Sequence, residues 1–256
     1  MDKLIIKVCG MRDGENIRQV AELGVDWIGM VFWDQSPRNV TMIPTRAGII
    51  PDRGSLPSSP EAGSTGSGQS VGSPSEEKRG RETKTVGVFV DEMAQNIITR
   101  VVNYQLSLIQ LNGHETPTLI RNLRRTLDPD IRPGVSFIKR IVVTSRDDIA
   151  AYKDYADSVD YLLFDIKEPS ASGGRPDWSI LDAYDGALPF LLGGDIRPDD
   201  ADSLLAADPA SSTLVRALRH PKCIGLDLNI PFEAEPGFVD ISKLKLFLGK
   251  RDQWCL

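Results

Sequence analysis

The chain has 256 residues, 41% of them hydrophobic and 26% charged, so it can bury a sizeable core in one large domain or two small ones. Its 30 Lys and Arg against 36 Asp and Glu give a formal net charge of -6, which argues against a general nucleic-acid or anionic-membrane binder but permits a local anion site. Three scattered cysteines do not resemble the framework of a disulfide-stapled secreted domain, and no run approaches the ~20 apolar residues of a membrane span. We therefore expect a cytoplasmic protein with no nucleic-acid or membrane partner, present as a monomer or homodimer. With only two histidines and no closely spaced cysteines, we expect no metal site.

Short apolar runs alternate along the chain with polar segments that have helical spacing. In chain order, strands are predicted at residues 4–8, 27–32, 85–90, 106–111, 137–143, 159–164, 189–192 and 223–228. Helices are predicted at residues 15–23, 93–104, 116–127, 145–155, 177–184, 198–206 and 240–248. The strands are continuously apolar, which is typical of parallel strands covered on both faces. This order favours an α/β fold, a (β/α)8 TIM barrel, whose usual size is about 250 residues. A doubly wound open sheet is the alternative, although no G-x-G-x-x-G follows the first strand.

One helix of this series is weak. After the second strand come TMIPTRAGII and then residues 51–80, where 18 of 30 positions are Ser, Gly or Pro. Such a composition cannot offset the entropy of ordering the chain, so we predict a degenerate second helix followed by a disordered Ser/Gly-rich insertion over residues 51–84. A regulatory peptide is the alternative interpretation of this stretch. The strands on both sides predict that it interrupts a single barrel domain spanning residues 1–256.

Polar residues and glycines cluster where the predicted strands end, which is where barrels of this kind carry their chemistry. They are Cys9-Gly10, Ser36-Pro37-Arg38, Asn112-Gly113-His114-Glu115, Asp165, Gly193-Gly194-Asp195 and Asp227-Leu228-Asn229. Each has an ordinary explanation when taken alone: Cys9 as a buried small side chain, Asp165 as a turn cap and Arg38 as a solvated arginine. Because residues two apart on a strand share a face, Lys7 is expected beside Cys9, where it could supply positive charge inside the barrel.

In the order of these features, the sequence resembles the phosphoribosylanthranilate isomerase family of tryptophan biosynthesis. The matching strings are KVCG, GVDWIG, FWDQSPR, VGVFVDE, QLNGHE, YLLFD, GGRPDW, LLGGDI, GLDLN and FEAEPG. The likeness covers nearly the whole chain outside residues 51–80. It implies an Amadori rearrangement of N-(5-phosphoribosyl)anthranilate to the 1-deoxyribulose 5-phosphate derivative, without a cofactor. The partner it implies is this small phosphosugar-anthranilate substrate.

The resemblance also implies roles for individual residues. Cys9 would be the general base, which needs a thiolate, and Asp165 the general acid, which needs to retain a proton. Arg38 would bind the anthranilate carboxylate, and Asp227 the ribose hydroxyls or the developing amine. The remaining implied binding residues are Asn112 for the substrate and Gly193, Gly194, Asn229 and Ile230 for the phosphate, through backbone N–H groups.

Several positions depart from the family pattern. Asn112 replaces a common His, Ile230 a usual Ser and Val239 a Lys, and SGGRPDW is shorter than its counterpart. These departures motivate one alternative, a weakly active or non-catalytic phosphosugar-binding barrel. A further alternative is another ribose-phosphate barrel enzyme of the tryptophan or histidine pathways, which the position of Cys9 and the SPR string disfavour. The retained Cys9, Arg38, Asp165 and Asp227 favour the isomerase.

Overall fold

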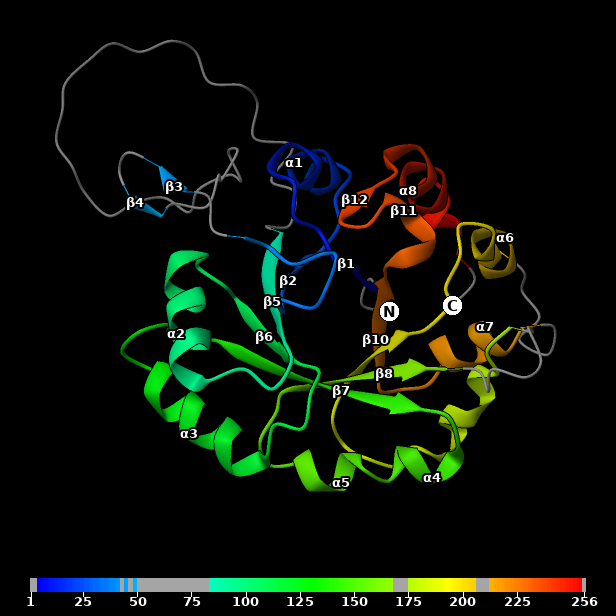
Figure 1. The fold of residues 1–256 in the computed structure, drawn as a ribbon. Helices are drawn as coiled ribbons and strands as arrows, with labels where there is room; N and C mark the ends of the chain where they lie inside the picture. The colour runs from blue at the N-terminus through cyan, green and yellow to red at the C-terminus, as the bar shows by residue number, and fades with distance from the viewer. Residues whose placement is uncertain are drawn as a thin grey trace, which may run out of the picture.

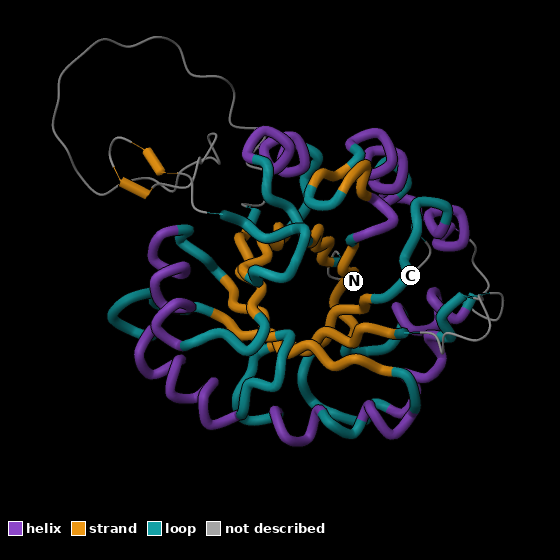
Figure 2. Tube along the Cα trace, viewed as in Figure 1, coloured by secondary structure: helices purple, strands orange, loops and turns teal. Residues whose placement is uncertain are grey.

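A computed structural model describes residues 4–41, 44–45, 48–49, 83–167, 175–205 and 212–254 of the chain. Eight parallel strands form a closed barrel in the order β1-β10-β9-β8-β7-β6-β5-β2, and helices surround it (Figure 1; Figure 2). The strands are β1 (Ile5–Cys9), β2 (Trp27–Phe32), β5 (Lys84–Phe89), β6 (Leu108–Leu111), β7 (Ser136–Val143), β8 (Tyr161–Ile166), β9 (Phe190–Gly193) and β10 (Cys223–Leu228). Each predicted strand coincides with one of these to within two residues at either end, so the predicted (β/α)8 barrel is confirmed.

The helices follow the prediction less closely. They are α1 (Gly14–Glu22), α2 (Ala94–Asn103), α3 (Pro117–Leu127), α4 (Arg146–Ile149), α5 (Tyr152–Tyr155), α6 (Asp200–Leu205), α7 (Thr213–Leu218) and α8 (Ile241–Leu248), with 3-10 helices η1 (Trp178–Ala183), η2 (Ile230–Phe232) and η3 (Arg251–Gln253). Thr116 caps α3 as expected, accepting a hydrogen bond from the Leu119 N–H at 3.2 Å. The predicted helix 145–155 is divided into α4 and α5, 177–184 is the 3-10 helix η1, and α7 was not predicted.

The chain enters and leaves the segment around residues 50–82 through neighbouring strands. β2 and β5 pair in register from Trp27 with Lys84 to Phe32 with Phe89. Within TMIPTRAGII, the described residues form the antiparallel pair β3 (Pro44–Thr45) and β4 (Gly48–Ile49), where a degenerate helix was expected. Residues 51–82 of the predicted insertion lie outside the described residues. Lys84, its predicted last residue, is the first residue of β5.

The barrel interior has an apolar layer and, toward the C-terminal ends of the strands, a polar layer. Trp27 and Tyr161 contact edge to face inside it, with ring centroids 5.3 Å apart, and pack with Leu108, Ile138 and Leu163. The outward-facing residues form a larger second core with the helices. Five buried or half-buried polar side chains lie instead on the inner face toward the C-terminal ends of the strands. They are Lys7, Gln110, Arg140, Asp165 and Asp227. The apolar layer thus forms a floor on which polar groups can be held.

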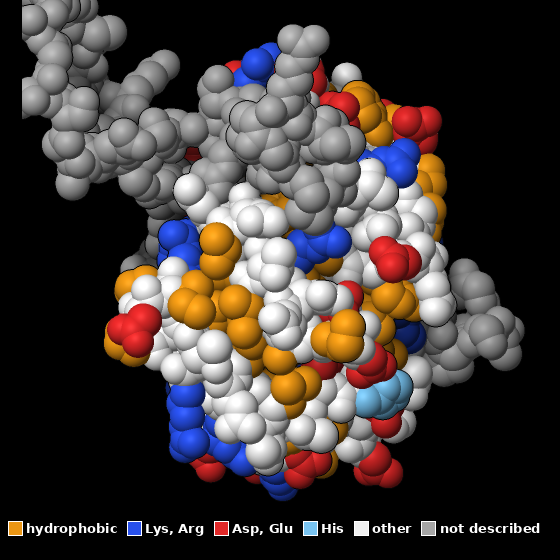
Figure 3. All heavy atoms as spheres, turned by 60° about the vertical axis from the view of Figure 1, so that its left-hand side comes forward, with side chains coloured by type: hydrophobic (Ala, Val, Ile, Leu, Met, Phe, Trp, Pro, Cys, Tyr) orange, Lys and Arg blue, Asp and Glu red, His pale blue; other side chains and the backbone are white. Residues whose placement is uncertain are grey.

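The surface carries both signs of charge. On the face drawn in Figure 3, acidic, basic and hydrophobic side chains are interspersed. A short antiparallel pair, β11 (Glu233–Glu235) and β12 (Phe238–Val239), follows η2 after the last barrel strand. Among the helices in the described ranges, none has both the length and the hydropathy required to cross a bilayer.

Candidate active site

The first strand places two functional side chains next to each other inside the barrel. Lys7 and Cys9 share its inner face, as predicted; Lys7 is fully buried and Cys9 is 8% exposed. The Lys7 Nζ donates to Asp227 Oδ1 on the neighbouring strand β10 at 2.6 Å. On the other neighbour, β2, a Cβ atom added at Gly29 would lie 2.8 Å from Cys9 Sγ and 3.3 Å from Lys7 Nζ. The thiol and the ammonium therefore pack against backbone at a position that accepts only glycine without a shift.

The charges around Cys9 oppose one another. Burial raises the pKa of the Cys9 thiol above its ordinary value; Lys7 opposes this rise in part, and Asp227 adds to it. Burial disfavours the charge on Lys7, but Asp227 and Cys9 outweigh burial and raise the pKa of Lys7. Lys7 therefore stays protonated beside the sulfur. Any thiolate formed at Cys9 has a buried counter-ion already in place.

Asp165, the predicted acid, lies near the end of β8 and is 6% exposed. Arg140, which projects inward from β7, directs both Nε and Nη2 at Asp165 Oδ2, with Nε at 2.8 Å. Lys167 Nζ lies 3.1 Å from Oδ1, yet among the described residues that oxygen has no hydrogen-bond partner. The sequence did not predict a charged partner for this carboxyl. The structure adds a guanidinium and an ammonium.

The Lys7–Cys9 pair and the Asp165–Arg140 pair both act electrostatically on one carboxylate, that of Asp227. Burial raises the pKa of Asp227, Lys7 opposes this rise, and the charges of Asp165 and Arg140 also act on it. Asp227 therefore lies between the Lys7–Cys9 pair on one side of the barrel and the Asp165–Arg140 pair on the other. The predicted base and acid are brought to the same end of the barrel.

Arg38, the predicted carboxylate ligand, follows β2 and is held by a fork-like ion pair. Its Nε donates to Glu233 Oε1 at 2.6 Å, and its Nη2 donates to Oε2 of the same carboxylate. Gly10, directly after Cys9, has φ +91, and a Cβ there would lie 2.8 Å from Arg38 Cδ. The arginine therefore crosses the end of β1 beside the thiol. Since a guanidinium has five N–H donors, the fork leaves donors for a second anion.

The glycines predicted to bind phosphate lie beside the predicted acid. Gly193 ends β9 and stands in register with Asp165. Gly194 has φ +126, and a Cβ there would lie 2.7 Å from the carbonyl oxygen of Ile166 at the end of β8. This backbone position fits only glycine, and it brings the loop after β9 against β8.

The other half of the expected phosphate cradle is arranged differently. The Ile230 N–H donates to the side-chain Oδ1 of Asn229 at 2.7 Å, so this donor is engaged within its own loop. Ile230 is 62% exposed. A ligand that used the Ile230 N–H would have to displace the Asn229 side chain first.

Asn112 lies at the end of β6 in the loop that carries QLNGHE. Its side-chain Oδ1 accepts a hydrogen bond from Gln110 Nε2 at 2.9 Å, and its backbone N–H donates to the Phe89 carbonyl at 2.8 Å. The Gln110 Oε1 atom is buried and has no hydrogen-bond partner among the residues described. Asn112 is thus fixed at the rim of the barrel, where an amide can donate and accept.

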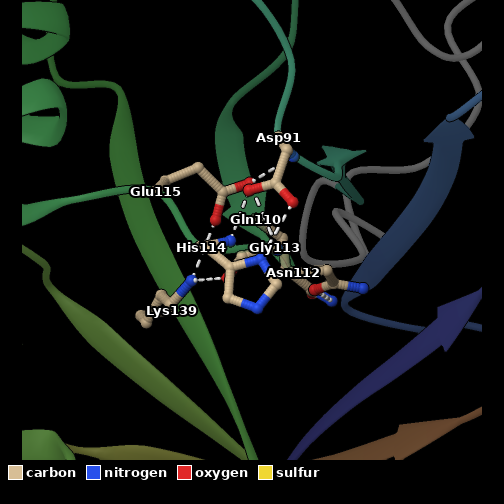
Figure 4. Close-up of polar contacts among 7 residues, drawn as sticks. All are labelled: Asp91, Gln110, Asn112, Gly113, His114, Glu115 and Lys139. Atoms are coloured by element: carbon tan, nitrogen blue, oxygen red, sulfur yellow. Dashed lines mark hydrogen bonds and ion pairs between the residues drawn. The ribbon is translucent and has the colours of Figure 1, made fainter.

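A buried ion pair behind this loop holds it in place (Figure 4). Lys139 Nζ on β7 binds Glu115 Oε2 at 2.8 Å and the Gly113 carbonyl at 2.5 Å. Glu115 Oε1 accepts the backbone N–H groups of Asp91 and Gly113 at 2.9 and 3.2 Å. The Asp91 carboxylate accepts the His114 backbone N–H and contacts its ring nitrogen at 3.1 Å. The loops after β5 and β6 are joined in this way to each other and to the middle of β7, outside the barrel interior.

Sequence reasoning missed Arg140 and Glu233, which hold Asp165 and Arg38. The run FIKRIVV did carry a signal, because two consecutive basic residues interrupt a strand expected to be apolar on both faces. One of them must then point into the barrel. Glu233 lies in the FEAEPG string, but nothing in its local pattern indicated a partner 195 positions away.

Two departures from the family pattern have local explanations. Val239 is buried in the outer core, and its backbone N–H and carbonyl bind the Asn16 side chain at 2.8 and 2.9 Å. Its side chain packs against the body of the protein. Of the shortened SGGRPDW, residues 172–174 lie outside the described residues.

The chain is similar to known proteins over almost its whole length. The family model for N-(5'phosphoribosyl)anthranilate (PRA) isomerase matches residues 61–250. A curated N-(5'-phosphoribosyl)anthranilate isomerase from Parabacteroides distasonis is 38% identical, covering 96% of this chain and 92% of that protein. One from Phocaeicola vulgatus is 31% identical, covering 98% of both.

Solved structures agree on the fold. The phosphoribosyl anthranilate isomerase of Thermotoga maritima has a TM-score of 0.68 at 24% identity, covering 97% of this chain and 98% of that one. Another such isomerase, solved in complex with reduced 1-(o-carboxyphenylamino)-1-deoxyribulose 5-phosphate, has a TM-score of 0.65 at 22% identity, with the same coverage. From the family match and the identity to its curated relatives, the chain belongs to the N-(5'-phosphoribosyl)anthranilate isomerase family.

Proposed function

We propose that this chain isomerises N-(5-phosphoribosyl)anthranilate in tryptophan biosynthesis, with Cys9 as general base and Asp165 as general acid. The observation that carries the proposal is the buried ammonium of Lys7, which binds Asp227 at 2.6 Å and lies beside the Cys9 thiol. An internal cation next to a thiol favours the thiolate, the form that can accept a proton. Cys9 ends β1 and Asp165 lies near the end of β8, so the two can serve as base and acid at the same end of the barrel.

The reaction consists of two proton transfers by the protein, followed by a tautomerisation. Asp165 gives a proton to the ribose ring oxygen as the C1–O bond breaks, while the lone pair of the anthranilate nitrogen forms a C1=N iminium. Cys9 thiolate then takes the proton from C2, and the electrons of that C–H bond neutralise the iminium to give an enolamine. Tautomerisation of the enolamine, in which C1 gains a proton and the C2 hydroxyl loses one, gives the ketone product. No step requires a cofactor.

The binding residues are assigned by the charges and donors that surround this centre. Arg38, held by Glu233 over the end of β1, offers its remaining N–H donors to the anthranilate carboxylate. Gly193 and Gly194 border Asp165 and offer backbone N–H groups to the phosphate. Asn229 and Ile230 complete this cradle once the Asn229 side chain releases the Ile230 N–H. Asp227 faces the ribose.

Asn112 contributes amide contacts from the opposite rim. The Asn112 side chain already accepts one hydrogen bond from Gln110, which leaves its amide N–H groups for the substrate. An amide cannot titrate, so we assign Asn112 to binding alone. We place the protein in the cytoplasm as a monomer or homodimer; one solved structure from Thermotoga maritima is of monomers generated from a dimeric phosphoribosylanthranilate isomerase.

The test uses freshly generated phosphoribosylanthranilate and two variants, Cys9→Ser and Asp165→Asn. We expect each to lose turnover, about 10²-fold or more, while still binding the reduced product analogue. Turnover at the wild-type rate in both variants would refute the assignment. Substrate fluorescence with the wild-type protein in excess tests the second candidate, a non-catalytic phosphosugar-binding barrel, which would bind the substrate without consuming it.

A further inference from the structure

We infer that Arg140 is a positioning residue for Asp165, holding one oxygen of that carboxyl so that the other serves in proton transfer. The inference deepens the proposed function and rests on its assignment of Asp165 as the acid. The inner face of β7 supplies the guanidinium: Ile138 packs in the barrel floor, and Arg140, two residues further, shares its face.

The geometry of the contact is asymmetric. Both Nε and Nη2 of Arg140 converge on Oδ2 of Asp165, whereas Oδ1 is buried and has no hydrogen bond among the residues that the structure describes. Two donors on one oxygen fix the rotation of the carboxyl about its Cβ–Cγ bond. Oδ1 is thereby the oxygen left to carry the transferred proton.

Lys167 does not replace this contact. Its Nζ lies 3.1 Å from Oδ1, but its side chain is 49% exposed, so solvent screens its charge. Arg140 is 24% exposed and Asp165 9% by side chain. The guanidinium is therefore the more rigid and the less screened of the two cations beside the carboxyl.

Arg140 also separates the two carboxylates of the site electrostatically. Asp165 raises the pKa of Asp227 and Arg140 lowers it. Asp227 also has its own cation, because Lys7 Nζ donates to it. Each carboxylate thus has a dedicated partner: an ammonium for Asp227, beside the base, and a planar fork for Asp165. The fork fixes the orientation of the Asp165 carboxyl, because a guanidinium holds direction as well as charge.

The experiment compares Arg140→Gln, Asp165→Asn and the double variant by single-turnover kinetics with the protein in excess, which resolves slow residual rates. We expect Arg140→Gln to lower the chemical rate about 10- to 100-fold with KM within about threefold of the wild-type value. Because Arg140 acts through Asp165, the double variant should be no slower than Asp165→Asn within about twofold. Arg140→Lys should restore part of the rate.

Arg124→Gln is the matched control, since Arg124 forms a 2.8 Å ion pair with Asp160 away from the site and its loss should leave turnover unchanged. An unchanged rate in Arg140→Gln, losses that multiply in the double variant, or a loss confined to KM would each overturn the inference. Melting temperatures of all variants separate unfolding from slowed chemistry. If Asp165→Asn itself turns over at the wild-type rate, the proposed function fails, and not the role of Arg140 alone.

Discussion

Replacing Lys7 with Met should make the Cys9 thiol much harder to ionise. A Cβ on Gly29 would lie 2.8 Å from the sulfur and 3.3 Å from the ammonium nitrogen, so these two atoms are within about 6 Å of each other. Two unit charges at that distance interact by about 3 kcal/mol at an effective dielectric constant of about 20. This corresponds to a factor of about 100 in the ionisation equilibrium of the thiol. At neutral pH the thiolate fraction would then fall about 100-fold.

Alkylation by iodoacetamide measures this change directly, since only the thiolate reacts. The rate at Cys9, followed by mass spectrometry of the modified peptide, should rise with pH along a curve that is shifted to higher pH in Lys7→Met. Cys223 provides an internal reference, because burial raises its pKa to about 12. The acidic limb of the pH profile of turnover should also shift to higher pH in Lys7→Met, because Cys9 must be ionised to act as the base.

Removing Lys7 also leaves Asp227 as a buried unpaired carboxylate. We therefore compare Lys7→Met/Asp227→Asn with Asp227→Asn, a pair in which neither variant contains an orphaned charge. Lys139→Met is a further control, since it removes a buried lysine that does not contact Cys9. Equal alkylation curves for the two Asp227→Asn variants would refute the proposal that Lys7 activates the thiol.

Three further outcomes follow from particular contacts. Gly29→Ala should slow turnover about tenfold or more and cost about 1–3 kcal/mol of stability, because its Cβ would lie 2.8 Å from Cys9 Sγ; unchanged kinetics and an unchanged urea midpoint would contradict this. Arg38→Lys should raise KM about tenfold with a smaller change in kcat, because an ammonium cannot keep the fork while offering a second planar pair of donors; a KM equal to that of the wild type would count against the carboxylate assignment. Lys139→Met should cost about 3–5 kcal/mol in chemical denaturation by leaving Glu115 buried and unpaired, and a loss below 1 kcal/mol would show that the pair is not structural.

The sequence identified the barrel and the ends of its strands because both are local signals. Apolar runs such as residues 27–32 and 223–228 are buried on both faces wherever the chain folds, so periodicity alone locates them. Helix 145–155 was predicted as one element, and α7 was missed, because short amphipathic segments depend on tertiary packing more than on propensity.

Within the site, the sequence placed Lys7 and Cys9 on one face because alternation along a strand is fixed by backbone geometry. It also indicated which residues follow the strands, including Asp165, Gly193 and Gly194. It could not indicate that Arg38 pairs with Glu233 or Asp165 with Arg140, since these partners come from separate strands and loops and leave no periodic trace. Only the closure of the barrel decides which charged side chains form ion pairs. Because the dielectric constant of its interior is low, these ion pairs have a strong effect on the chemistry of the site.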